Sequence, residues 1–249
     1  NSLRLRLAMR LSNVDPSKAA EEAKKALSDE GGVLEAPTDV IAVNASTSGF
    51  TNPLGEINKG WHEVFMNASM ESFLVGYNDP RISKYFTPAA GGSEGALFDI
   101  AGTYKGVRQG TGVTHNKYKD HSPSTVAQNT DAILLTAAEV WFLRAEAALR
   151  GYISGDAGEY YKKGVETSFA QWGAGSAAEY LESEKTPADY KDAFDAKFDA
   201  KAESTVTPKW DNALSNEQKL EKIITQKWLA IYPEGCEAWT EQRRTGYPK

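Results

Sequence analysis

The sequence predicts a mainly α-helical protein in which helices pack in pairs, loop-rich insertions separate them, and β-structure is scarce. Residues 133–150 place apolar side chains around most of a helix of about five turns, and such a helix is buried between other elements. Residues 156–172 continue with helical spacing, so the two segments are typical of one helical-repeat unit. Residues 87–130 show no helical period and are rich in glycine and proline, which predicts a long loop insertion.

The composition indicates a globular protein with enough chain for a sizeable core. The chain has 249 residues, of which 41% are hydrophobic and 25% are charged. Its net charge of −6 disfavours nucleic acid and anionic membrane surfaces as partners. Cys236 is the single cysteine, so the sequence supports neither an internal disulfide nor a cysteine-based metal site. We expect residues 1–249 to belong to a single α-helical domain, and we expect no cofactor.

The first two elements are expected to form a helical hairpin. Residues 1–12 alternate leucine with arginine, which is compatible with a strand, but Ala8 and Met9 favour a helix. Asp15 and Pro16 supply an N-cap and a proline at the first position of a second helix, which ends before the glycines at 31–32.

The following segment is expected to be mostly irregular. Residues 33–61 have no helical period, and only residues 40–43 suggest a short strand. Apolar side chains between Met66 and Tyr77 recur at helical intervals and predict a helix, which a turn at residues 78–81 follows.

Three signals define the helices towards the end of the chain. Asp156 and Glu159 have the spacing of a capping box, and Gly164 lets a neighbouring element approach closely. Residues 220–231 predict a helix that stops before the Pro-Glu-Gly sequence at 233–235, and a last short helix is expected over residues 236–244.

The glutamates of the 133–150 helix suggest ion pairing rather than catalysis. Glu139 and Glu146 lie on one face about two turns apart, and an unpaired buried charge is heavily penalised. We expect them to pair with Arg144, Arg150 or an arginine from elsewhere. The alternative, a glycoside hydrolase, needs the two carboxylates in an open cleft. Tryptophans on apolar helix faces are interpreted as core residues: Trp141, Trp228 and Trp239.

No catalytic or metal-binding motif is convincing. His115 and His121 are six residues apart, which fits no standard ligand spacing, so we favour a solvated loop over a metal site. Residues 91–95 match the Gly-x-Ser-x-Gly pattern around Ser93, but no strand precedes the pattern and no apolar helix follows it.

Six blocks that span nearly the whole chain carry a family resemblance. They are residues 1–10 (NSLRLRLAMR), 69–81 (SMESFLVGYNDPR), 135–151 (LTAAEVWFLRAEAALRG), 169–173 (FAQWG), 223–235 (IITQKWLAIYPEG) and 237–248 (EAWTEQRRTGYP). In this order they resemble SusD/RagB-type outer-membrane lipoproteins, and the block at 223–235 is more specific than those at 135–151 and 169–173.

The resemblance implies a fold of tetratricopeptide-like helix pairs and a place at the outer membrane, on the cell surface. It implies a protein that captures glycans or other nutrients for a partner SusC-like TonB-dependent transporter. Family members are longer than this chain, which lacks their signal peptide and lipid-anchored cysteine. We therefore expect a domain that is incomplete at both ends, with membrane contact only through a lipid anchor outside this chain.

A glycan-binding protein needs aromatic rings that cover the apolar face of a sugar and polar side chains that bind its hydroxyls. Side chains in or near the 87–130 loop meet this need, and the candidate ligand-binding residues are Trp61, Tyr104, Arg108, Asn116 and Tyr118. Ordinary loop packing would also account for each of them. A helical-repeat scaffold that contacts only proteins, with no small ligand, is the alternative function.

Overall fold

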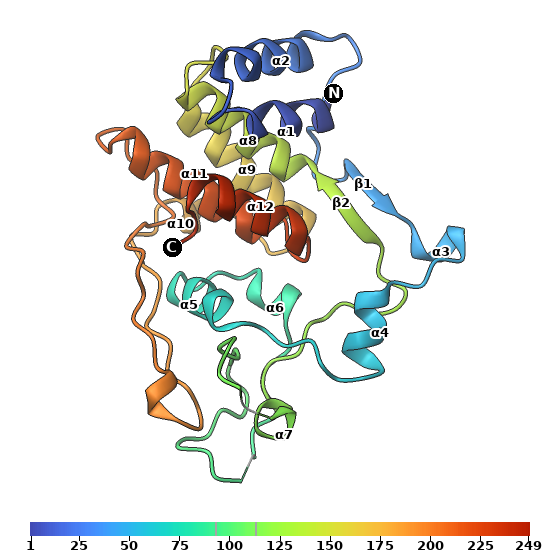
Figure 1. Ribbon diagram of the computed structural model, residues 1–249, viewed down its shortest axis with the longest axis vertical. Coiled ribbons are helices and arrows are strands. Elements are labelled where there is room, and N and C mark those ends of the chain that lie inside the picture. Colours follow the sequence, from blue (N-terminus) through green and yellow to red (C-terminus); the bar gives the residue numbers. More distant parts are fainter. Residues whose placement is uncertain (93, 113) are drawn as a thin grey trace. The chain divides into compact units, whose positions relative to one another are not determined.

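The computed structural model describes residues 1–92, 94–112 and 114–249. It is mainly helical, as the sequence predicts (Figure 1). Its internal contacts divide into two compact units, which are described separately. The helical unit comprises residues 1–42, 133–184 and 208–249, and the loop-rich unit comprises residues 43–132 and 185–207.

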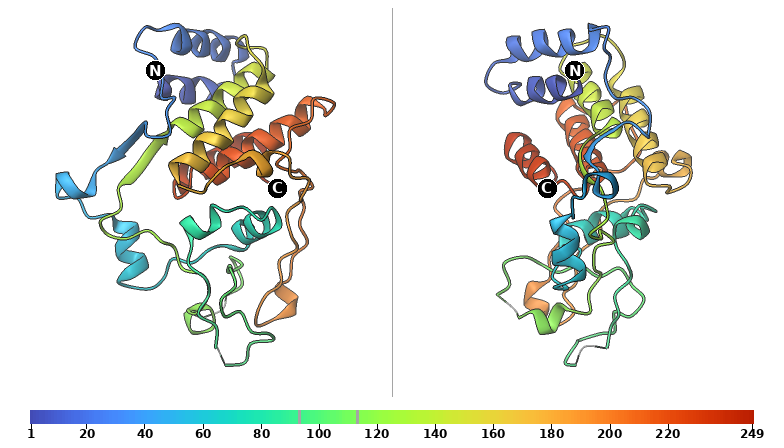
Figure 2. Two further views of the ribbon diagram at one scale, coloured as in Figure 1. Left: turned by 180° about the vertical axis from the view of Figure 1, so that it is seen from behind. Right: turned by 90° about the vertical axis from the view of Figure 1, so that its right-hand side faces the viewer.

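Paired helices build the helical unit (Figure 2). Helix α1 packs on α2, α8 packs on α9, and α11 packs on both α8 and α9. The helices are α1 (Ser2–Arg10), α2 (Pro16–Ser28), α8 (Ala137–Leu149), α9 (Ala157–Gln171), α10 (Ala178–Leu181), α11 (Asn216–Ala230) and α12 (Gly235–Thr245). Small and aliphatic side chains of α1, α2 and α8 form a buried cluster of Leu5, Ala8, Met9, Ala23, Ala26, Val140, Leu143 and Ala147. This arrangement confirms the predicted helix pairs.

Helix starts and close approaches follow from local sequence. The Asp15 carboxylate accepts from the Lys18 backbone N–H at 2.9 Å, and the Asp156 carboxylate accepts from the Glu159 N–H at 2.9 Å. Gly164 faces the ring of Phe142, and a Cβ at this position would come within 2.7 Å of that ring. The absence of a side chain at Gly164 is therefore what allows α8 and α9 to pack this closely.

The predicted helix at 133–150 is wrong over its first residues. Residues 133–136 belong to strand β2 (Ala132–Thr136), which pairs with β1 (Val40–Val43), the predicted short strand. The helix begins at Ala137 because Thr136 is its N-cap, with the hydroxyl accepting from the Glu139 N–H at 3.2 Å. An apolar run of this length suits a strand as well as a helix, and the neighbouring β1 decides between them.

The loop-rich unit contains short helices joined by irregular chain. They are α3 (Ala45–Ser48), α4 (Pro53–Lys59), α5 (Ala68–Gly76), α6 (Ile82–Tyr85), α7 (His115–Tyr118) and the 3₁₀ turn η1 (Ala196–Phe198). Helix α5 is the helix that the sequence predicts between Met66 and Tyr77. Isolated bridges join Phe65 to Pro123 and Asn67 to Val107, so two parts of the 87–130 segment lie against the chain that leads into α5.

In the part of the chain that the structure describes, no helix combines the length and the apolar character needed to cross a bilayer.

Candidate functional site

Trp61 is an exposed aromatic side chain of the loop-rich unit, at 61% exposure. It follows directly after α4, and His62 next to it has a φ of 56°, in the left-handed region that non-glycine residues rarely occupy. His115 of α7 lies against this corner. Its Nε2 is 2.9 Å from the His62 carbonyl oxygen, and its ring centroid is 6.0 Å from that of Phe65. The result is an exposed indole on a corner that α7 supports.

The structure brings only some of the predicted ligand-binding residues to this corner. Asn116 is exposed on α7 beside His115, so it lies on a segment that contacts the Trp61 corner. Arg108 is exposed, but its Nη1 donates to the carbonyls of Phe198 and Asp199 at 3.0 and 3.3 Å, which anchors it on η1. Tyr104 is half-buried. Trp61 and Asn116 are both exposed, and each is the sequence neighbour of one residue of the His62–His115 contact.

Tyr118 does not have the exposed ring that stacking on a sugar requires. Its side chain is 4% exposed, and its ring meets those of His121 and Phe194 edge-on at 5.0 and 5.6 Å. The hydroxyl donates to Asp192 at 3.3 Å, and burial together with that carboxylate raises the pKa of Tyr118 to about 12. The Tyr118 ring is buried because residues 190–195, a segment distant in the sequence, cover it.

His121 is fully buried, so the predicted solvated loop is wrong at this residue. Its ring stacks on that of Phe194 at 6.1 Å, and neither ring nitrogen has a hydrogen-bond partner among the described residues. Burial, helped by the nearby charge of Lys105, lowers the pKa of His121 to about 4. Among the described residues no group of three or more histidine, cysteine, aspartate or glutamate side chains could hold a metal ion.

Lys105 and Glu71 form a partly buried ion pair that the sequence analysis missed. The Lys105 Nζ lies 2.6 Å from a Glu71 carboxylate oxygen and 4.3 Å from the centre of the Tyr190 ring. The other Glu71 oxygen accepts from the Gly106 N–H at 2.7 Å. Burial raises the pKa of Glu71, although Lys105 opposes the shift. A 34-residue separation along an irregular chain gives no sequence signal for such a pair.

The glutamates of α8 are buried and ion-paired, as predicted. Arg6 lies 2.5 Å from Glu139, and Arg244 lies 2.6 Å from Glu146. Arg150 pairs with Glu146 at 2.8 Å, whereas the other predicted partner, Arg144, pairs with Glu35 instead. Both carboxylates are therefore engaged in the interior, where they do not face an open cleft.

Lys227 of α11 is at the centre of this charged network. Its side chain is 1% exposed, and its Nζ lies within 3.3 Å of three carboxylates, those of Glu139, Glu237 and Glu241. These carboxylates raise the pKa of Lys227 against the opposing effect of burial. The network joins α8, α11 and α12, and Arg6 and Arg10 extend it to α1.

The three tryptophans predicted as core residues differ in exposure. Trp141 is buried, and its indole N–H donates to the Glu35 carbonyl at 3.0 Å. Trp228 is half-buried. Trp239 is 65% exposed, so its prediction is wrong. The buried face of α12 carries Glu237 and Glu241, which meet Lys227, and Trp239 is thereby turned outward.

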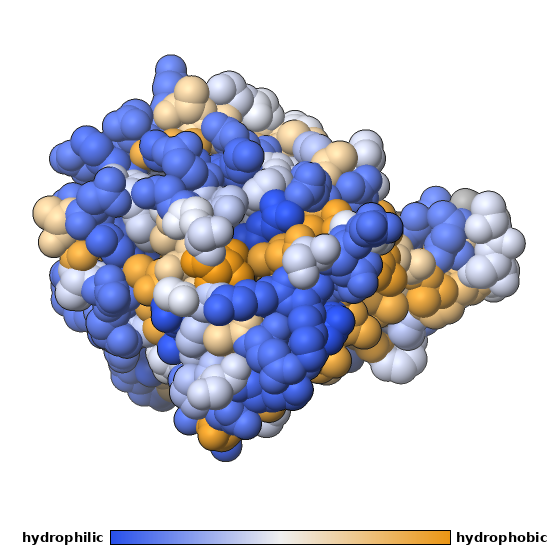
Figure 3. All heavy atoms as spheres, turned by 90° about the horizontal axis from the view of Figure 1, so that it is seen from above, coloured by the Kyte–Doolittle hydropathy of each residue, from blue (hydrophilic) through white to orange (hydrophobic). Residues whose placement is uncertain are grey.

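Apolar surface is also exposed elsewhere in the helical unit. Figure 3 shows apolar side chains lying among polar ones on one face of the molecule. Exposed apolar residues of the helical unit include Leu3, Leu7, Ile41 and Leu134. The sequence signal for this exposed surface is the alternation of leucine and arginine in residues 1–7. In a helix this alternation places leucines on two opposite sides, and a single core buries only one of those sides.

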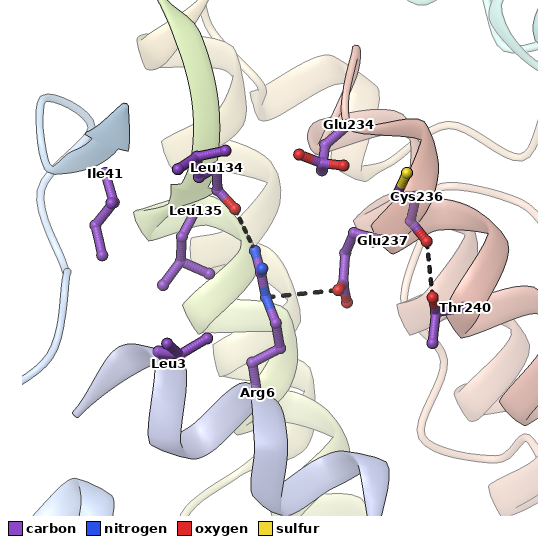
Figure 4. Close-up of a pocket in the computed structure, with 9 residues that line it drawn as sticks. All are labelled: Leu3, Arg6, Ile41, Leu134, Leu135, Glu234, Cys236, Glu237 and Thr240. Atoms are coloured by element: carbon purple, nitrogen blue, oxygen red, sulfur yellow. Dashed lines mark hydrogen bonds and ion pairs between the residues drawn. The ribbon is translucent and has the colours of Figure 1, made fainter. Parts of the chain in front are cut away.

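A pocket of about 410 Å³ opens beside these residues in the helical unit (Figure 4). Leu3, Ile41, Leu134 and Leu135 lie along one side of it, while Glu234, Cys236, Glu237 and Thr240 lie along the other. Arg6 points between the two walls, and its Nη2 donates to the Leu134 carbonyl at 2.6 Å. The pocket is thus apolar on one side and acidic on the other.

The Gly-x-Ser-x-Gly pattern cannot be placed, because Ser93 lies outside the described residues.

The family model described as SusD-like, Susd and RagB outer membrane lipoprotein, matches residues 1–249. A SusD homologue from Bacteroides vulgatus is 49% identical with a TM-score of 0.90, and the match covers 99% of this chain and 50% of that one. A chitin-binding SusD homologue from Flavobacterium johnsoniae is 42% identical with a TM-score of 0.91, covering 100% of this chain and 50% of that one. The comparison with curated proteins gave no match.

The chain therefore spans about half the length of these solved relatives. A family match over all 249 residues, and relatives well above 30% identity with the same fold, agree with the blocks in the sequence. The chain belongs to the SusD-like family of outer membrane lipoproteins.

Proposed function

We propose that this chain is a glycan-binding part of a cell-surface nutrient-binding protein that delivers its ligand to a SusC-like TonB-dependent transporter. Family membership supports the general role, and the chitin-binding SusD homologue, which is 42% identical, supports a glycan as the ligand class. The observation that carries the proposal is Trp61, an indole that is 61% exposed on a supported corner. An exposed ring of this kind can cover the apolar face of a sugar.

The proposed site uses two residues of the predicted set. Trp61 supplies the stacking surface, and Asn116 on the adjoining α7 supplies an amide that can both donate to and accept from sugar hydroxyls. Tyr104 and Arg108 are retained as candidates for a longer ligand. Tyr118 is not retained, because its ring is covered.

Binding without catalysis is part of the proposal. A glycoside hydrolase needs two carboxylates on either side of the scissile bond. Glu139 and Glu146, the pair that the sequence offers for this task, are held by Arg6, Lys227 and Arg244 in the interior. Their engagement supports a binding protein over a hydrolase.

Affinity electrophoresis in gels that contain polysaccharides, chitin derivatives among them, tests the proposal. We expect at least one polysaccharide to retard the protein, and we expect Trp61→Ala to remove the retardation. Trp239→Ala is the matched control, because Trp239 is exposed to nearly the same degree, 65% against 61%. Retardation by none of the polysaccharides would instead favour the protein-binding scaffold.

A further inference from the structure

The corner that carries Trp61 is closed by backbone hydrogen bonds to the end of α4. The Trp61 N–H donates to the Glu56 carbonyl at 3.3 Å, and the Glu63 N–H donates to the Ile57 carbonyl at 3.2 Å. Between these two donors His62 has a φ of 56°. The position of the exposed indole therefore depends on the left-handed conformation of the next residue.

Histidine is a less common residue than glycine in this conformation. A left-handed residue at the end of a helix is usually glycine, because a Cβ crowds the neighbouring carbonyl. In the described part of the chain every other positive φ belongs to a glycine, apart from that of Asn78. Strained conformations of this kind persist where surrounding contacts impose them, and they gather at binding sites. His62 therefore needs a contact that holds its backbone.

His115 of α7 supplies that contact. Its Nε2 lies 2.9 Å from the His62 carbonyl oxygen. Because a carbonyl oxygen only accepts, the contact assigns a proton to Nε2, and the ring can donate in both its neutral and its protonated form. The bond holds the peptide group between His62 and Glu63, next to the residue that bears the indole.

The other end of α7 is fixed in the interior of the loop-rich unit. Tyr118 is the last residue of this helix, and its hydroxyl donates to Asp192 at 3.3 Å. Its buried ring also meets that of Phe194 at 5.6 Å. One short helix thus connects the exposed corner to buried side chains. Loss of the His115 donor would free the corner without releasing α7.

We infer that His115 is a positioning residue for Trp61, because its hydrogen bond holds the strained His62 backbone and so fixes the indole in one orientation before a glycan arrives. A ring that is already held loses less conformational freedom on binding than a mobile one. The contact therefore raises affinity without touching the ligand. The inference rests on the proposed glycan site, and it adds His62 and His115 to the residues on which that site depends.

A matched pair of substitutions at His115 separates the hydrogen bond from the bulk of the side chain. Glutamine carries an amide N–H, and methionine a methyl group, as many bonds from the backbone as the Nε2 of histidine. Amide hydrogen exchange at Trp61 and Glu63, measured without ligand, reports how firmly the corner is held. Loss of one hydrogen bond in His115→Met should speed this exchange by about two- to tenfold, and His115→Gln should keep the wild-type rate. Exchange at Lys119, whose N–H donates within α7, should change in neither variant.

Affinity electrophoresis then compares glycan binding by the same variants. His115→Met should bind the retarding polysaccharide about two- to tenfold more weakly than the wild type, whereas His115→Gln should bind as the wild type does.

His62→Gly gives an independent test. Glycine adopts a positive φ without strain, so the midpoint of urea unfolding should stay the same or rise. The retardation should nevertheless weaken, because glycine allows the corner more conformations. A residue with a purely structural role would not lower affinity while stability is kept.

Equal exchange at Trp61 and Glu63 in His115→Met and in the wild type would overturn the inference, because the hydrogen bond would then not hold the corner. Faster exchange with undiminished retardation of His115→Met would also overturn it, since the orientation of Trp61 would then not matter for binding. Failure of the proposed function looks different: no polysaccharide retards the wild type. If the exchange still responded to His115→Met, His115 would then support the corner without a part in binding.

Discussion

His121 and Trp61 are both polar-aromatic side chains of the loop-rich unit, yet their surroundings give them opposite chemistry. His121 is sealed between the rings of Tyr118 and Phe194, and its nitrogens have no partners among the described residues. Three charged groups act on it, with Lys105 opposing protonation and Asp192 and Asp120 favouring it. Burial is the largest effect, so the neutral imidazole is the folded form.

Stability should therefore depend on pH through His121. Its pKa is about 4 in the folded chain, against about 6.5 for an unperturbed histidine. As pH falls, the unfolded chain takes up the proton first, so this stabilisation is complete above about pH 6.5 and is lost towards pH 4. The loss amounts to about 3 kcal/mol at most.

Urea unfolding of the wild type and of His121→Leu between pH 4 and pH 7 measures this effect. As pH falls, the free energy of unfolding of the wild type should decrease more than that of His121→Leu. The variant lacks the imidazole that takes up a proton on unfolding. Ring-proton NMR titration gives the pKa of His121 directly. A difference that is constant over this pH range would contradict the assignment.

At the scale of elements, the α8–α9 pair depends on Gly164. An added Cβ would come within 2.7 Å of the Phe142 ring, which is fully buried and has little freedom to move. Alanine is the better helix former by about 1 kcal/mol, but overpacking a filled interior costs about 1–3 kcal/mol.

Gly164→Ala is accordingly expected to lower the free energy of unfolding by up to about 2 kcal/mol. Gly235→Ala is the matched control, since a Cβ there meets nothing within 4 Å and its φ is not positive. The control should be neutral or slightly stabilising. Equal effects of the two substitutions, measured by urea unfolding, would show that Gly164 is not a packing constraint.

The charged network around Lys227 joins elements that are distant in the sequence. Lys227→Met would leave Glu139, Glu237 and Glu241 close together with one positive charge fewer between them. Removal of one member of a buried ion pair typically costs about 3–5 kcal/mol. We expect a loss of this size in the free energy of unfolding. Lys162→Met, which removes an exposed pair with Glu159, should cost less than about 1 kcal/mol, and an equally small effect of Lys227→Met would contradict the structural role of the network.

For the whole molecule, periodicity and family blocks predicted the helices well and the surface poorly. Helix pairs, N-caps and the pairing of Glu139 and Glu146 depend on spacing along the chain, and the structure confirms them. The exposure of Trp239 and the burial of Tyr118 depend on segments far away in sequence. Trp239 is exposed because the acidic face of α12 is the one that packs against Lys227, and Tyr118 is buried because residues 190–195 cover it. Neither contact produces a periodic pattern in the sequence.

The same limit applies to the candidate site. The sequence identified Trp61 as an aromatic at a loop end, but the support of its corner by His115 requires a contact across 53 residues. Asn116 gains its place through that contact, whereas Tyr118, two residues further on, is turned into the interior. The sequence could therefore predict a set of candidate aromatic and polar side chains. Which of them are exposed depends on contacts between segments that are distant in the sequence.

The central claim is that Trp61 stacks on a glycan, and calorimetric titration tests it most directly. Affinity electrophoresis first identifies the polysaccharide that retards the protein most. An oligosaccharide derived from it is then titrated into the wild type, Trp61→Ala and Trp239→Ala. Loss of one stacking contact should weaken the affinity of Trp61→Ala by about tenfold, or ~1.4 kcal/mol, and leave Trp239→Ala unchanged. Equal affinities of Trp61→Ala and the wild type would contradict the account, as would a loss of affinity confined to Trp239→Ala.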